Sequence, residues 1–133
     1  MEPTSEPTEA KKKILYVEDE PFFASTISRS LVEAGFDVVT AVDGEEGLAK
    51  VQSEHPDLVL LDIILPKVEG KEVLRRIKAD ATTKDIPVIV LSNLSALDDE
   101  REVAAMGAAA FFVKALSLPS EIVDVVRVQL SKS

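Results

Sequence analysis

The chain has 133 residues, of which 46% are hydrophobic, and carries a formal net charge of −9 at pH 7. This length predicts one domain with a real core, and the composition excludes wholesale disorder. With no cysteine, disulfides and thiolate metal sites are excluded, so we expect a cytoplasmic protein. The acidic excess argues against direct nucleic-acid binding, and no apolar run approaches the roughly 18 residues of a membrane span.

The predicted elements begin after a polar lead. Residues 1–12 repeat Glu-Pro-Thr without apolar periodicity, so we expect a disordered lead or linker there and a folded domain at 13–131. Apolar and β-branched runs predict strands at 13–17, 37–41, 58–61, 87–91 and 110–113. Apolar residues at helical spacing predict intervening helices at 21–34, 45–54 and 70–79, and one that follows a Ser95-x-x-Asp98 capping signature and ends near Met106.

The last segment is ambiguous from its own residues. Val126 to Leu130 alternates apolar and polar residues like a strand, whereas Ile122, Val125 and Val126 fit one face of a helix. The regular alternation of strand and helix before it favours a helix. Five strand–helix units predict an α/β fold, a doubly wound five-stranded parallel sheet with five helices on its two faces.

Polar residues stand at the ends of four predicted strands. Because the carboxyl ends of parallel strands meet at one edge of the sheet, we expect these side chains to converge. They are Glu18, Asp19, Asp62, Ser92 and Lys114.

This set of residues suits phosphoryl transfer to a carboxylate. Asp62, at the exit of a strand buried on both faces, would form a covalent acyl phosphate. Glu18 and Asp19 beside it would repel one another without a cation, and Mg²⁺ prefers such oxygen ligands. Lys114 would supply a second cation, and the Ser92 hydroxyl a hydrogen-bond donor.

Each residue also has a simpler interpretation. Asp19 and Ser92 could cap a helix or a turn, and Lys114 could be a lysine that reaches from an apolar strand into solvent. His55, the only histidine, stands in a polar turn, and we expect it at the surface without a catalytic role. The convergence of the strand ends favours the phosphoryl-transfer hypothesis.

The pattern resembles the receiver domain of two-component response regulators, of the chemotaxis-regulator type. The resemblance covers residues 13–131 and depends on an acidic pair after the first strand, an Asp in LLDIILP with Gly eight residues later, a Ser after the fourth strand and a Lys after the fifth. It implies a flavodoxin-like fold. It also implies that Asp62 accepts a phosphoryl group from a sensor histidine kinase or phosphotransfer protein.

The resemblance assigns further roles by position. Mg²⁺ would be bound by Glu18, Asp19, Asp62 and the backbone carbonyl of Ile64, and Lys114 would pair with the phosphoryl group. Ser92 and Phe111 would form a switch that remodels the face of the fourth helix, fifth strand and fifth helix for a downstream protein or output domain. Such a domain promotes its own phosphorylation and slow dephosphorylation, and is not a conventional enzyme.

The sequence departs from the family pattern after the hydroxyl and after the lysine. Ala115 stands where proline is usual, so we expect a trans Lys114–Ala115 bond; Asn93 is larger than the usual small residue. Ile64 and Leu94, two residues after Asp62 and Ser92, cannot orient an attacking water. We therefore expect slow self-dephosphorylation.

Two other functions compete with this hypothesis. An aspartate-nucleophile hydrolase would need a second Asp at position 64, where Ile64 stands. A degenerate receiver that binds proteins without phosphorylation remains an alternative. The chain would be either a single-domain regulator or a receiver from a longer protein, with residues 1–13 as a linker.

Overall fold

The computed structural model describes residues 11–92 and 97–132, with the side chains of Leu97 and Asp98 left out. The expectations for residues 1–10, Asn93, Leu94 and the Ser95–Asp98 cap lie outside the described residues. Strands and helices alternate along the chain as β1 (Lys13–Val17), α1 (Pro21–Glu33), β2 (Asp37–Ala41), α2 (Gly44–Glu54), β3 (Leu58–Asp62), α3 (Gly70–Ala79), β4 (Val88–Ser92), α4 (Leu97–Ala105), β5 (Ala110–Val113) and α5 (Pro119–Ser131).

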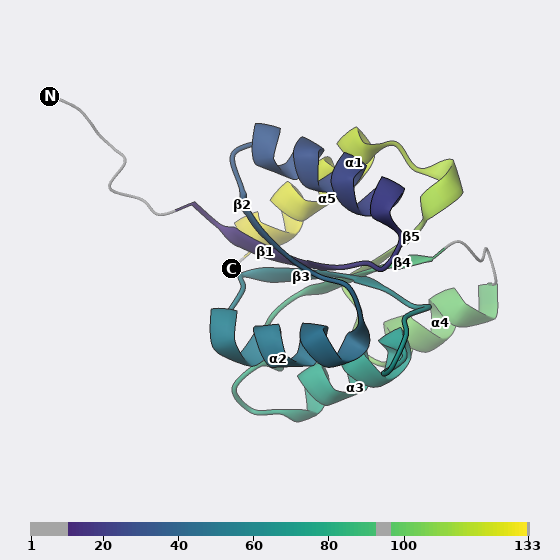
Figure 1. Ribbon diagram of the computed structural model, residues 1–133. Helices are drawn as coiled ribbons and strands as arrows, with labels where there is room; N and C mark the ends of the chain where they lie inside the picture. The colour runs from purple at the N-terminus through teal and green to yellow at the C-terminus, as the bar shows by residue number, and fades with distance from the viewer. Residues whose placement is uncertain (1–10, 93–96, 133) are drawn as a thin grey trace, which may run out of the picture.

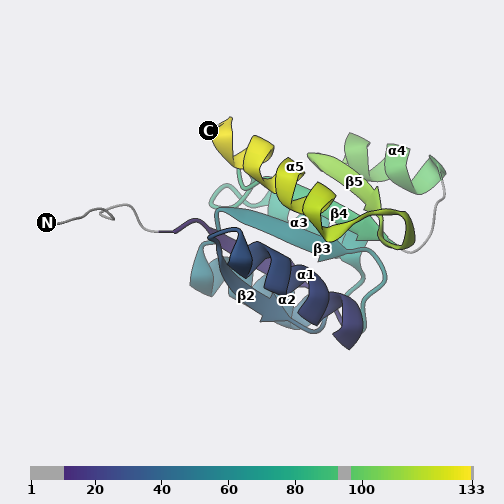
Figure 2. The same ribbon diagram turned by 90° about the horizontal axis from the view of Figure 1, so that it is seen from above.

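The five strands form one parallel sheet in the order β2-β1-β3-β4-β5. Helices α1 and α5 cover one face of this sheet, and α2, α3 and α4 cover the other (Figure 1). Figure 2 shows α1 and α5 running side by side over the sheet. The predicted fold class is confirmed.

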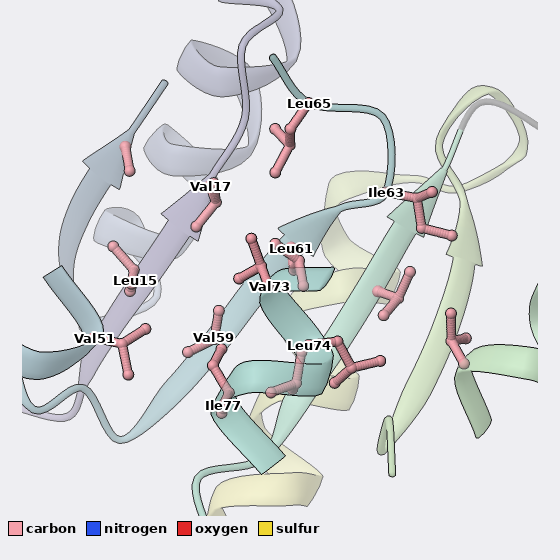
Figure 3. Close-up of a cluster of buried hydrophobic side chains, with 14 residues drawn as sticks. Leu15, Val17, Val51, Val59, Leu61, Ile63, Leu65, Val73, Leu74 and Ile77 are labelled. Carbon is pink, nitrogen blue, oxygen red and sulfur yellow. The ribbon is translucent and has the colours of Figure 1, made fainter. Parts of the chain in front are cut away.

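The helices pack on the sheet through two apolar layers, one on each face. There are two layers because successive residues of a strand point to opposite faces. Ile14 and Tyr16 of β1 face the α1–α5 layer. Leu15 and Val17 face the layer beneath α2 and α3, where they join Leu74 and other apolar side chains (Figure 3). Within the described residues, no helix is long and apolar enough to cross a membrane.

The ends of several helices follow local rules. Pro21 opens α1, and the carboxylate of Asp43 accepts the backbone N–H of Glu46 at 2.7 Å at the start of α2. Gly35, with φ 101°, follows the end of α1, where a left-handed residue is favoured. His55 ends α2 with φ 48° and is exposed, as expected for a surface residue.

The C-terminal ambiguity is resolved in favour of a helix. Ile122, Val123 and Val126 are buried on the inner side of α5, so tertiary packing outweighs the strand preference of valine. Strands β3 and β4 each end one residue later than predicted, at Asp62 and Ser92, and β4 also begins one residue later, at Val88. The ladder continues because the Ile63 N–H donates to the Leu91 carbonyl at 3.0 Å.

Candidate functional site

Four polar side chains are buried together at the carboxyl edge of the sheet. Lys114 and Asp62 are each 4% exposed, Glu18 is 2% exposed and Ser92 is fully buried. In the part of the chain that the structure describes, the other buried residues with a polar side-chain group are Thr83 and Tyr16. A group of ionisable residues withdrawn from water in this way requires partners or a ligand.

Lys114 forms the centre of the site. Its ammonium donates to both carboxylate oxygens of Glu18, at 2.9 and 2.8 Å, and to Oδ2 of Asp62 at 3.1 Å. The same Nζ lies 4.6 Å from the ring centre of Phe23. Burial alone would lower the pKa of Lys114, but Glu18 and Asp62 outweigh it and raise the pKa above its usual value. The lysine therefore stays charged and points into the site, not into solvent.

The backbone after Lys114 is trans, as expected with Ala115 in place of proline; the described residues contain no cis peptide bond. Lys114 to Leu116 form a short 3₁₀ turn. The side chain of Leu116 is 78% exposed. The turn carries the chain away from the site into the loop before α5.

Asp62 is held at both of its oxygens. Oδ2 accepts from Lys114, and Oδ1 accepts the backbone N–H of Ile64 at 3.2 Å. Burial, and then the charge of Glu18, raise the pKa of Asp62 to about 7, against the opposing effect of Lys114. Two buried carboxylates thus share one buried lysine, which leaves a net negative charge that a further cation would neutralise.

The loop after Asp62 returns close to the strand at Gly70. The backbone N–H of Gly70 donates to the carbonyl of Ile63 at 2.8 Å. A Cβ at this position would collide with the carbonyl oxygen of Asp62 and with the backbone of Ile63. This close approach explains the glycine eight residues after Asp62.

The acidic groups fit a hard divalent cation. Carboxylate oxygens of Glu18, Asp19 and Asp62 lie within 4.8 Å of one another. Asp19 is exposed, so the group opens to solvent on that side. An all-oxygen set with access to water is the chemistry that Mg²⁺ prefers.

Tyr16 and Phe23 belong to the site but were not predicted from the sequence. The Tyr16 hydroxyl donates to Oε1 of Glu18 at 2.9 Å, and Phe23 lies beneath Lys114. Burial, and then Glu18, raise the pKa of Tyr16 above its usual range, so the hydroxyl keeps its proton. Residues two apart in an extended chain point the same way, and this spacing could have indicated that Tyr16 and Glu18 lie together.

The expected switch residues lie on the neighbouring strands. Ser92 ends β4 opposite Val113 of β5, and Phe111 lies opposite Val90. Phe111 is partly buried and, with residues of α4, lines a pocket of about 220 Å³ that includes Val103 and Ala108. The site and this pocket are therefore connected through the adjacent strands β4 and β5.

Comparisons with known proteins agree on one family. A family model described as the response regulator receiver domain matches residues 14–127. The chain is 39% identical over 102 residues to the "DNA-binding dual master transcriptional regulator RpaA" of Synechocystis, covering 77% of this chain and 42% of RpaA. It is 40% identical over 112 residues to the "Probable transcriptional regulator ycf27" of Cyanophora paradoxa, covering 84% of this chain and 45% of that protein. The chain thus spans less than half the length of these relatives.

Solved structures give the same result. A CheY-like receiver domain from Methanospirillum hungatei has a TM-score of 0.85 at 27% identity, with 92% of this chain and 96% of that chain covered. The phosphorylated cyanobacterial phytochrome response regulator RcpA has a TM-score of 0.76 at 36% identity, with 88% and 89% covered. The Mn²⁺-bound response regulator Rcp1 has a TM-score of 0.81 at 28% identity, with 92% and 96% covered.

One expectation is wrong. The acidic charge of the chain predicts no direct nucleic-acid binding, yet RpaA is named as a DNA-binding regulator and ycf27 as a probable transcriptional regulator. The net charge counts only the 133 residues of this chain. In relatives more than twice as long as the matched region, it cannot describe the partners of the whole protein.

Proposed function

Because the chain belongs to the response regulator receiver domain family, we propose that it accepts a phosphoryl group on Asp62 from a histidine kinase or a phosphotransfer protein. The observation that carries the proposal is the position of Lys114, whose ammonium bridges Glu18 and Asp62 in one buried site. Such a lysine lies where the charge of an incoming phosphoryl group must be neutralised.

The chemistry follows from the contacts of Asp62. A carboxylate oxygen attacks the phosphorus of a phosphohistidine, the new O–P bond forms as the P–N bond breaks, and the imidazole leaves with a proton. Lys114 keeps its positive charge beside Oδ2, and the Ile64 N–H holds Oδ1. These contacts fix the direction of the carboxylate and stabilise the charge that gathers on the phosphoryl oxygens.

Glu18, Asp19, Asp62 and the backbone carbonyl of Ile64 would hold the metal ion. Mg²⁺ bound there would neutralise the excess negative charge and bind phosphoryl oxygens. The donor chemistry supports Mg²⁺, since every donor is an oxygen and Asp19 opens to water. The Mn²⁺-bound form of Rcp1 adds support from a relative of the same fold.

Ser92 and Phe111 are proposed as the switch. The hydroxyl of Ser92 would donate to a phosphoryl oxygen on Asp62, one strand away. Phe111 would then occupy a different position against α4, since it already lines the pocket between β5 and that helix. The change on the α4–β5–α5 face would be a population shift that a partner or an output domain senses.

The direct test is phosphorylation by a small-molecule donor. Incubated with acetyl phosphate and Mg²⁺, the protein should gain the mass of one phosphoryl group, measured by intact-protein mass spectrometry. Asp62→Asn should abolish the gain and chelation of Mg²⁺ should prevent it, whereas Asp124→Asn, at an exposed position of α5, should leave it unchanged. A wild-type protein that gains no phosphoryl group would favour a phosphorylation-independent binding module instead.

A further inference from the structure

Tyr16 is a buried polar residue to which the proposed reaction gives no role. Its side chain is fully buried in β1, between the sheet and the α1–α5 layer. The ring packs like the apolar residues around it, and a phenylalanine would fill the same space. Its hydroxyl, however, donates to Oε1 of Glu18 at 2.9 Å.

The carboxylate of Glu18 depends more on hydrogen bonds for its position than the carboxylate of an aspartate at the same place would. Glutamate has one more rotatable bond, so its carboxylate can occupy more positions, and ordering it has an entropic cost. Within the described residues, the only other donors to Glu18 are Lys114 and the Glu20 N–H, the latter at 3.3 Å. Of these, the ammonium of Lys114 also donates a hydrogen bond to Asp62. Its position therefore depends on both carboxylates and not on Glu18 alone.

We propose that Tyr16 is a positioning residue, whose hydroxyl fixes the carboxylate of Glu18 for binding of the divalent cation. The inference rests on the proposed function, because it deepens the metal site of that reaction. A group that hydrogen-bonds a metal ligand orients it before the metal arrives, and losing such a group lowers metal affinity about 10–100-fold.

The test is a double-mutant cycle read by Mg²⁺ affinity, measured by isothermal titration calorimetry. Tyr16→Phe should weaken Mg²⁺ binding about tenfold. In the Glu18→Asp background, the same substitution should change the affinity less than about twofold, because the shorter side chain withdraws from the hydroxyl. Circular dichroism and thermal unfolding of all four proteins check that each one folds.

Tyrosine fluorescence gives a second readout in the wild type. Tyr16 is the only tyrosine and the chain has no tryptophan, so the emission reports this one hydroxyl. Mg²⁺ should change the emission with the same midpoint as the calorimetric titration. The Glu18→Asp variant should lose most of this change, because its emission no longer depends on the contact with position 18.

The outcomes separate the two proposals. Equal Mg²⁺ affinity of wild type and Tyr16→Phe would overturn the inference and leave the metal site standing. An equal loss in both backgrounds would also overturn it, because Tyr16 would then act by packing alone. A wild type that binds no Mg²⁺ would overturn the metal site of the proposed function and the inference with it.

Discussion

At the scale of single residues, the site is defined by an imbalance of charge. Among the residues that the structure describes, Lys114 is the one buried cation, and it faces the two buried carboxylates of Glu18 and Asp62. Burial of an unneutralised carboxylate is unfavourable, so the site opposes the stability of the domain until a cation or a phosphoryl–metal pair completes it. The unneutralised charge at the sheet edge lowers the stability of the domain, and the burial of the two apolar layers offsets this loss.

The imbalance predicts a pH dependence of stability. The pKa of Asp62 is raised from its ordinary value of 3.8 to about 7, so between these values the folded state holds more protons than the unfolded state. Stability should therefore fall as pH rises through this window. With Mg²⁺ chelated, Asp62→Asn should be more stable than wild type by about 1–2 kcal/mol at pH 8. The gain from removing a buried charge is reduced because the substitution also removes the ion pair with Lys114.

Urea denaturation at pH 8 and at pH 4 measures this difference. The gap in unfolding free energy should become smaller at the lower pH, where Asp62 is protonated in the folded state and roughly half protonated in the unfolded state, whose pKa is near 3.8. A gap that is the same at both pH values would show that the substitution acts by packing and not by charge.

Ile64 predicts the lifetime of the phosphorylated state. Its backbone N–H holds Asp62, while its side chain is 53% exposed at the rim of the site and cannot orient a water for attack on the phosphoryl group. Ile64→Asn should therefore speed dephosphorylation several-fold. Decay of the phosphoprotein is followed by mass spectrometry, and Val42→Asn, at another exposed apolar position, is the control. Equal decay of Ile64→Asn and wild type would contradict the prediction.

At the scale of elements, one ion cluster ties α3 to α4. Lys71 at the start of α3 donates to Asp99 and to Glu102 of α4, each at 2.7 Å. These contacts raise the pKa of Lys71, so the tie persists across the neutral range. Because α4 belongs to the face proposed to change on phosphorylation, we expect stronger ion pairs between Lys71 and α4 to make the movement of this helix less favourable.

Removing the tie should loosen α4 without unfolding the domain. Lys71→Met should speed hydrogen exchange of the α4 amides, because the ion pairs that restrain this helix are lost. The amides of β1 and β3 should keep their protection, since these partly exposed pairs contribute only about 1 kcal/mol or less to the stability of the whole domain. Lys50→Met is the matched control, since Lys50 pairs with Glu46 inside α2. Unchanged exchange in α4 of Lys71→Met would mean that the pair does not restrain the helix.

At the scale of the whole molecule, the parallel sheet brings together residues that are far apart in the sequence. Glu18 and Lys114 are 96 residues apart in sequence, and Asp62 and Lys114 are 52 apart. Order β2-β1-β3-β4-β5 places the carboxyl ends of β1, β3, β4 and β5 side by side. The site is therefore a property of the complete sheet, on which the proposed phosphoacceptor Asp62, the ammonium of Lys114 and the expected switch residues are all placed.

The sequence by itself determined the elements and the residues at the strand ends, because hydrophobic periodicity and strand exits are local features. Strands 13–17, 37–41 and 110–113 and helix 70–79 coincide with β1, β2, β5 and α3. The family follows from the same positions. The roles of Asp62, Asp19, Ser92 and Phe111 remain predictions, and the phosphorylation experiment tests the role of Asp62.

Only the tertiary structure decided how these residues interact. It placed Lys114 against both oxygens of Glu18 and brought Tyr16 to the same carboxylate. The physical reason is that burial and ion pairing depend on neighbours distant in sequence. The pattern of residues along the chain identifies which side chains lie at the sheet edge, and only the packed sheet determines which of them contact the same lysine.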